Sequence, residues 1–158
     1  MSSSTDDILE RELAKLGRNS GALGGLAGAG LAGAAGGGLG GGTGAAWAAR
    51  RLPSRGAEAT VEVPMNPRAA LTAAFRALST VGEIVADEVT PDEPVLRAVV
   101  GAGTLGLNPA VIELSVEAIS EAEAKITVRA TAKEGLIKQH TAEKALQRVL
   151  AAAGWRAS

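Results

Sequence analysis

Glycine is concentrated in one part of this 158-residue chain, and this clustering limits what the chain can fold into more than any other feature. Thirteen of the 21 glycines fall between Gly21 and Gly44, and residues 20–49 carry no charge. At about 1.5 Å per residue, a helix of that length is long enough to cross a bilayer. Glycine weakens a helix by roughly 1 kcal/mol relative to alanine, so a flexible linker fits the same composition. Both interpretations stay open.

The spacing of the small residues favours helix packing. They recur at every fourth position in two series, which places each series on one helix face and lets neighbouring helices approach closely. The first series is Gly24, Gly28, Ala32, Gly36, Gly40 and Gly44, and the second is Gly21, Gly25, Ala29, Gly33, Gly37 and Gly41.

The end of this tract is typical of a membrane interface. Trp47 precedes Arg50 and Arg51, an aromatic side chain followed by two basic ones. Residues 20–49 resemble glycine-zipper membrane segments. The resemblance implies that Gly24, Gly28, Gly36, Gly40 and Gly44 pack helices in a homo-oligomer, and that Trp47, Arg50 and Arg51 lie at the membrane interface.

The chain divides into four parts. Residues 1–19 predict a short amphipathic helix, capped by Ser4 or Thr5 and ended by Gly17, with leucines on one face. Residues 20–49 form the glycine tract, residues 50–56 a basic linker, and residues 57–154 a globular domain. We predict a membrane-associated protein with this domain on the cytoplasmic side. A cytoplasmic protein is the alternative. Equal numbers of basic residues flank the tract, so the positive-inside rule gives no orientation.

The first half of the domain predicts a strand, a helix and two more strands. Alternating residues predict a strand over residues 60–64. Asn66 and Pro67 are typical of a helix start, and Gly82 of its end, with Leu71, Phe75 and Leu78 on the inner face. Strands are predicted over residues 83–89 and 95–102.

The second half predicts a hairpin and a last helix. Residues 111–119 and 125–133 alternate between apolar and polar, and a loop over residues 120–122 would set Glu117 opposite Lys125 and Glu113 opposite Arg129. A helix over residues 141–153 ends at Gly154.

The predicted fold is therefore α+β in the order β-α-β-β-β-β-α, an antiparallel sheet of about five strands with two helices on one face. This order resembles the helix-grip or TATA-binding-protein-like class of folds across residues 57–154. The resemblance lies in element order, so it assigns no functional residue.

The composition argues against several classes of catalytic, metal-binding and nucleic-acid-binding site. The chain has no cysteine and one histidine, His140, which fits a capping or surface role better than catalysis. A net charge of −1 and 2% aromatic residues argue against nucleic-acid binding. We predict no catalytic residue, no metal site and no cofactor site.

One glycine motif is compatible with either a dinucleotide-binding turn or a turn between two strands. Gly101, Gly103 and Gly106 match the spacing of a dinucleotide-binding turn, with Asn108 and Pro109 as a possible helix start. The alternation of residues 111–119 instead favours a strand, a turn and a strand.

Two functions compete at this stage. The first is a non-catalytic membrane-associated or self-assembling protein, in which the tract packs helices and the domain is an interaction module. The alternative is a domain that binds an apolar small molecule or lipid between sheet and helices, since its inward residues are Ala, Val, Ile and Leu. Ala69, Ala73 and Ala77 could leave room for such a ligand or allow tight packing.

Overall fold

The structure is a computed structural model that describes residues 4–19, 51–85, 95–102, 108–134 and 140–156. The chain forms two compact units. The first consists mainly of residues 55–132 and 138–158, and the second of residues 3–54 and 133–137.

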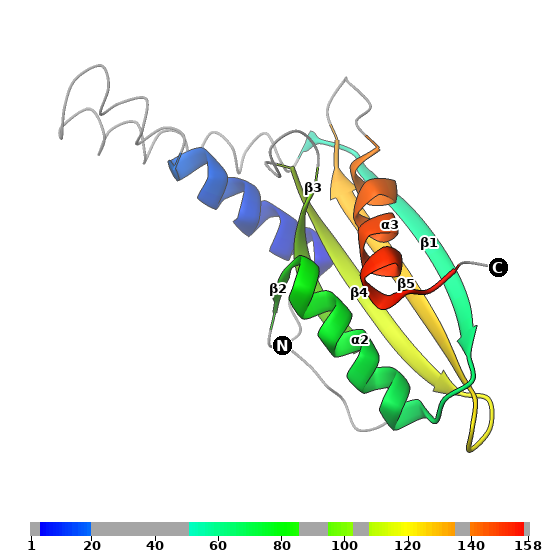
Figure 1. Ribbon diagram of the computed structural model, residues 1–158. Coiled ribbons are helices and arrows are strands. Elements are labelled where there is room, and N and C mark those ends of the chain that lie inside the picture. Colours follow the sequence, from blue (N-terminus) through cyan, green and yellow to red (C-terminus); the bar gives the residue numbers. More distant parts are fainter. Residues whose placement is uncertain (1–3, 20–50, 86–94, 103–107, 135–139, 157–158) are drawn as a thin grey trace, which may run out of the picture. The chain divides into compact units, whose positions relative to one another are not determined.

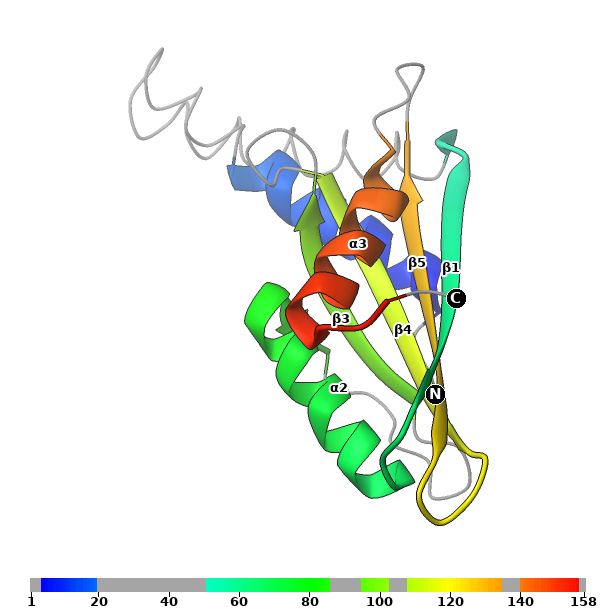
Figure 2. The same ribbon diagram turned by 45° about the vertical axis from the view of Figure 1, so that its right-hand side comes forward.

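The first unit is an antiparallel sheet with two helices on one face (Figure 1). The strand order across the sheet is β1-β5-β4-β3-β2. Figure 2 shows from a second angle that both helices cover the same face. This confirms the predicted α+β class and element order. The elements are β1 Ser54–Val63, α2 Pro67–Val81, β2 Glu83–Ile84, β3 Val95–Ala102, β4 Asn108–Ala118, β5 Ala124–Lys133 and α3 Thr141–Ala153.

Helix α2 begins and ends where its sequence predicts. The Asn66 side chain accepts a hydrogen bond from the Ala69 N–H at 2.8 Å, which satisfies one of the free donors of the first turn. At the other end the Gly82 N–H donates to the Leu78 carbonyl at 2.9 Å.

The buried face of α2 differs from the predicted one. Phe75 is 50% exposed, so its predicted place on the inner face is wrong, and Leu71 is only half-buried. The buried positions are Ala70, Ala74, Ala77 and Leu78. A stripe of alanines lets the helix lie close to the sheet and to α3, which a phenylalanine at the contact would prevent.

The register of the β4–β5 hairpin is the predicted one. In the β4–β5 hairpin Glu117 lies opposite Lys125, and Glu113 lies opposite Arg129. Asn108 pairs with Ala102 and begins β4, so it opens a strand and not a helix. A dinucleotide-binding turn needs a helix at this point, and the antiparallel pairing of β3 with β4 rules it out.

The core lies between the sheet and the two helices. Alternate residues of β1, β3, β4 and β5 turn inward, while α3 contributes its predicted inner face of Ala145, Leu146, Val149 and Leu150. Gly154 ends α3 with a φ of 70°, a left-handed conformation that favours glycine. The fully buried large side chains of the sheet in this core are Val100, Ile112, Leu114, Ile126 and Val128.

The second unit contains a helix over residues 5–19. Ser4 caps it as predicted: its hydroxyl accepts from the Asp7 N–H at 3.2 Å, and the Asp7 carboxylate accepts from the Ser4 N–H at 3.1 Å. These contacts with the Ser4 hydroxyl and backbone lower the pKa of Asp7. The helix does not end at Gly17, because the two residues that follow still adopt helical geometry.

A buried lysine holds this helix within the second unit. The Lys133 side chain is 5% exposed, and its Nζ lies 3.5 Å from Asp6 Oδ1 and 3.7 Å from Glu10 Oε1. The Ser54 hydroxyl also donates to Asp6 Oδ1 at 3.0 Å. Two carboxylates thus offset the burial of one ammonium group.

None of the helices in the part of the chain that the structure describes has the length and apolar character needed to cross a membrane. The glycine tract lies outside the described residues. The predicted linker over residues 50–56 contains the first residues of β1, which starts at Ser54. Of the strand predicted over residues 83–89, the described part is β2, followed by a Val85 N–H that donates to the Arg97 carbonyl at 3.0 Å.

Candidate functional site

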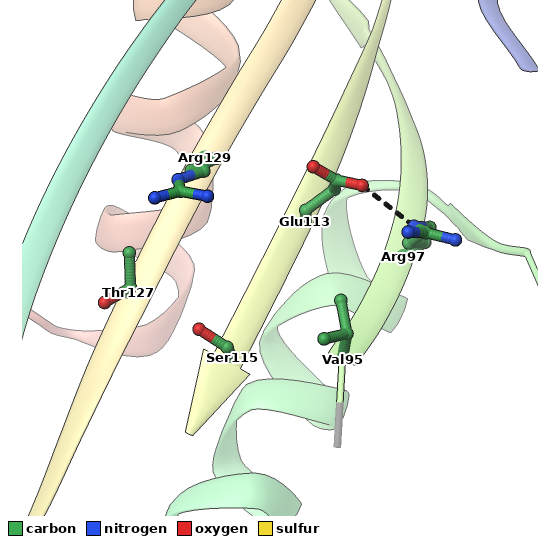
Figure 3. A pocket seen from close by; sticks show the side chains of 6 residues that line it. All are labelled: Val95, Arg97, Glu113, Ser115, Thr127 and Arg129. Atoms are coloured by element: carbon green, nitrogen blue, oxygen red, sulfur yellow. Dashed lines mark hydrogen bonds and ion pairs between the residues drawn. The ribbon is translucent and has the colours of Figure 1, made fainter. Parts of the chain in front are cut away.

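The face of the sheet away from the helices carries a polar pocket of about 380 Å³ (Figure 3). Strands β3, β4 and β5 build it from two adjacent rows of side chains, each row running across the three strands. One row is Arg97, Glu113 and Arg129, and the next is Val95, Ser115 and Thr127. The residues between them along each strand face the core, so the period-two geometry of strands creates the pocket.

The side chains of the charged row form two ion pairs, and neither of them joins the facing residues Glu113 and Arg129. Glu113 lies opposite Arg129, yet its Oε1 pairs with Arg97 Nε at 2.9 Å. Arg129 Nε instead meets Glu58 Oε2 of β1 at 2.5 Å. The hydrogen bond with Glu58, more than its charge, raises the pKa of Arg129. The other predicted pair is confirmed, since Lys125 Nζ lies 2.5 Å from Glu117 Oε2.

The two ion pairs of this row have different exposure. The Arg97 and Glu113 side chains are 20% and 27% exposed, whereas those of Arg129 and Glu58 are 63% and 51% exposed. Water screens the second pair more strongly, so it stabilises the fold less. The first pair is therefore the more shielded of the two, while the Arg129 side chain is largely exposed to solvent.

The hydroxyl row supplies groups with spare hydrogen-bonding capacity. Ser115 and Thr127 are directly opposite each other on β4 and β5. Figure 3 shows both beside the charged row. Within the described residues neither hydroxyl takes part in a hydrogen bond, nor do the terminal nitrogens of Arg129. These groups can therefore bind a polar ligand.

Among the site residues predicted from the sequence, the structure describes Arg51, which does not line this pocket. Gly24, Gly28, Gly36, Gly40, Gly44, Trp47 and Arg50 lie outside the described residues, and Arg51 is exposed in the second unit. The pocket was not predicted, because the outward residues of the strands over residues 111–119 and 125–133 were set opposite each other but β3 was given no register beside them. The signal was present in the alternation, but only the register of β3 on β4 brings the rows together.

Other sequence candidates have local roles. His140 stands at the N-terminal cap of α3 with a φ of 53°, and its Nδ1 lies 3.4 Å from Glu143 Oε1 without a side-chain cap bond. Among the small residues of α2, Ala77 is buried and contributes to tight packing, while Ala69 is exposed. In the described residues no group of three or more His, Cys, Asp or Glu side chains is placed to hold a metal ion.

The fold and pocket together define a two-layer α+β domain with one face covered by helices and one polar face that carries a binding-sized pocket. Neither a model of any protein family nor any curated protein matches the sequence.

Proposed function

We propose that this is a non-catalytic, self-associating protein of the membrane or its surface, whose α+β domain is an interaction module that binds through the polar face of its sheet. The observation that carries the proposal is the pocket opposite the helix layer. It joins fixed charges with unused hydroxyl and guanidinium donors, which is the composition of a recognition site.

The chemistry of the pocket supports binding in preference to catalysis. A serine or threonine nucleophile needs an adjacent base that accepts its proton. Within the described residues, Ser115 and Thr127 hydrogen-bond no such base, and the pocket carboxylate of Glu113 is paired with Arg97.

The self-association part of the proposal is supported by the sequence of residues 20–49. Two uninterrupted series of small residues and the absence of charge favour close helix contact in lipid. A homo-oligomer would present several sheet faces at once, which raises the avidity for a multivalent partner without new contacts.

The first test compares two glycine triples in the full chain. Replacing Gly28, Gly36 and Gly40 with leucine adds bulk to one small-residue series, so helix contact should fail while hydrophobicity rises. Replacing Gly30, Gly38 and Gly42 with leucine makes the same compositional change outside both series. Chemical cross-linking and vesicle flotation are measured on the same samples.

We expect the first triple to lose cross-linked oligomers and still float, and the control triple to keep both properties. Intact oligomers in the first triple contradict helix packing. A native protein that is monomeric and does not float contradicts the membrane and self-association part of the proposal.

The second test concerns the domain. Because the chain has no cysteine, an introduced cysteine is the only thiol that can be labelled. Thr127→Cys places the only thiol in the pocket, and Ala74→Cys places it in the buried core as a matched control. If the sheet face is a binding surface, maleimide should label the pocket variant in vesicle-bound oligomers and leave the core variant unlabelled. Protection of the pocket variant in the assembled protein contradicts the role of this face.

A further inference from the structure

The donors that line the pocket are arranged for one kind of ligand. Arg129 uses Nε for Glu58, so the edge of its guanidinium formed by the two terminal nitrogens remains for a partner. The Ser115 and Thr127 hydroxyls lie in the adjacent row and can each donate one hydrogen bond. Parallel donation from a guanidinium edge is the geometry that matches a planar carboxylate.

The charge balance of the pocket limits the charge of that ligand. Its lining carries two arginines and one glutamate, a formal charge of +1. Glu58 adds a further negative charge beside Arg129. With Glu58 counted the group is formally neutral, so a bound anion is held by directed hydrogen bonds and not by net charge. A second negative charge on the ligand, as in a doubly charged phosphate, would add repulsion from the Glu113 and Glu58 carboxylates.

Glu113 does not block such a ligand. Its Oε1 is paired with Arg97 at 2.9 Å in a setting about three-quarters buried, which directs that oxygen toward β3. Figure 3 shows Glu113 turned to Arg97, with Arg129 on the other side of it. The space beside Arg129, Ser115 and Thr127 is thus left to an incoming group.

We propose that this pocket binds a carboxylate group, held by the terminal nitrogens of Arg129 and by the hydroxyls of Ser115 and Thr127. This inference rests on the proposed function, because it names the chemistry that the interaction module recognises. The carboxylate can belong to a small organic acid or to the free C-terminus of a peptide. The contacts are the same in both cases.

The test is saturation-transfer NMR observed on the ligand, which suits weak binding to a large assembly and uses the full chain. The probes are acetate, inorganic phosphate and a tripeptide with either a free or an amidated C-terminus. We expect saturable signals from acetate and the acid peptide, none from the amide, and no tighter binding of phosphate than of acetate. An acid peptide that binds at least about tenfold more tightly than acetate identifies a polypeptide as the source, and equal affinities identify a small acid.

Three variants assign the contacts. Arg129→Gln should weaken acetate binding at least about tenfold, because a hydrogen bond to a charged group is lost. Ser115→Ala and Thr127→Val should each weaken it by a smaller factor. Arg76→Gln is the matched control, since it removes an exposed arginine from α2 and should leave binding unchanged.

Four results overturn the inference, and the first two concern binding at Arg129. One is the absence of a saturable acetate or acid-peptide signal, and the other is undiminished binding in Arg129→Gln. Equal binding of the acid and amide peptides, or tighter binding of phosphate, also overturns the carboxylate assignment. In those last two cases the proposed function survives, because the pocket still binds a ligand. Its own failure is read separately from cross-linking and thiol labelling.

Discussion

Gly82 shows how much a single residue can depend on a neighbouring strand. A Cβ built at this position would lie 2.8 Å from Val100 Cγ2 and even closer to the Val99 carbonyl oxygen. Its φ of −159° is ordinary extended backbone, so contact and not conformation excludes a side chain. The turn from α2 into β2 therefore requires a residue without a side chain at position 82.

We expect Gly82→Ala to reduce the free energy of unfolding by about 1–3 kcal/mol, because the backbone of β3 must move. Gly56→Ala is the matched control, since its nearest neighbour is the Ala130 carbonyl oxygen at 3.7 Å. That change should be neutral or slightly stabilising. Urea unfolding of both variants measures the difference, and similar midpoints would contradict the close approach.

Asp7 gives the helix over residues 5–19 a dependence on pH. Hydrogen bonds with Ser4 lower the pKa of Asp7 from the ordinary 3.8. Because the pKa is lowered, the ionised carboxylate stabilises the folded helix at pH values above the ordinary pKa. This contribution is lost as the pH falls through the lowered pKa. We expect the amide signals of residues 5–19 to lose helical character on acidification in the native protein. Asp7→Asn should reduce this pH dependence, and an unchanged acid transition would contradict the role of the cap.

At the scale of elements, the charge pairs on the sheet face away from α2 and α3 show that residues opposite each other in the register need not form the ion pair. Lys125→Glu should destabilise the domain by about 0.5 kcal/mol, since it faces Glu117 across the hairpin. Adding Glu117→Lys should restore the urea midpoint. For Arg129→Glu the restoring partner should be Glu58→Arg and not Glu113→Arg, because Arg129 pairs with Glu58. Rescue by Glu113→Arg alone would contradict this arrangement.

Substitutions around Lys133 test whether its ion pairs with Asp6 and Glu10 stabilise the N-terminal helix. Removing both carboxylates by Asp6→Asn and Glu10→Gln leaves a buried ammonium without counter-charge, which should cost about 1–3 kcal/mol. Lys133→Met keeps the volume and removes the charge, so it should be close to neutral. Hydrogen exchange of residues 5–19 reports the effect. Equal loss of protection in both variants would show that the charges are not what holds the helix.

At the scale of the whole molecule, the first unit has its own core. The buried apolar cluster runs from Val61 to Leu150, with Trp155 packed against it, and draws on the sheet and both helices. We expect residues 54–158 to fold without the N-terminal helix and glycine tract, with a cooperative thermal transition by circular dichroism. The control is the full chain under the same conditions. A broad, non-cooperative melt of the truncated protein would contradict an independent domain.

Much of the fold could be predicted because its signals are local. The Asn66 cap, the end of α2 at Gly82 and the bounds of α3 depend on residues within a few positions of one another. Strand alternation and a short connecting loop were enough to set Glu117 opposite Lys125. Gly17 was misjudged because a glycine weakens a helix without forcing it to end.

The amino-acid sequence by itself determined the order of the elements in the first unit, the ends of α2 and the register of the β4–β5 hairpin. Only the tertiary structure decided that α2 turns its alanines inward and Phe75 outward, because the distance between helix and sheet selects the buried face. It also decided that Glu113 pairs with Arg97 and Arg129 with Glu58, since Glu113 and Arg129 each have an oppositely charged neighbour on both adjacent strands. The pocket follows from those choices. Its six residues come from strands that only the folded sheet places side by side.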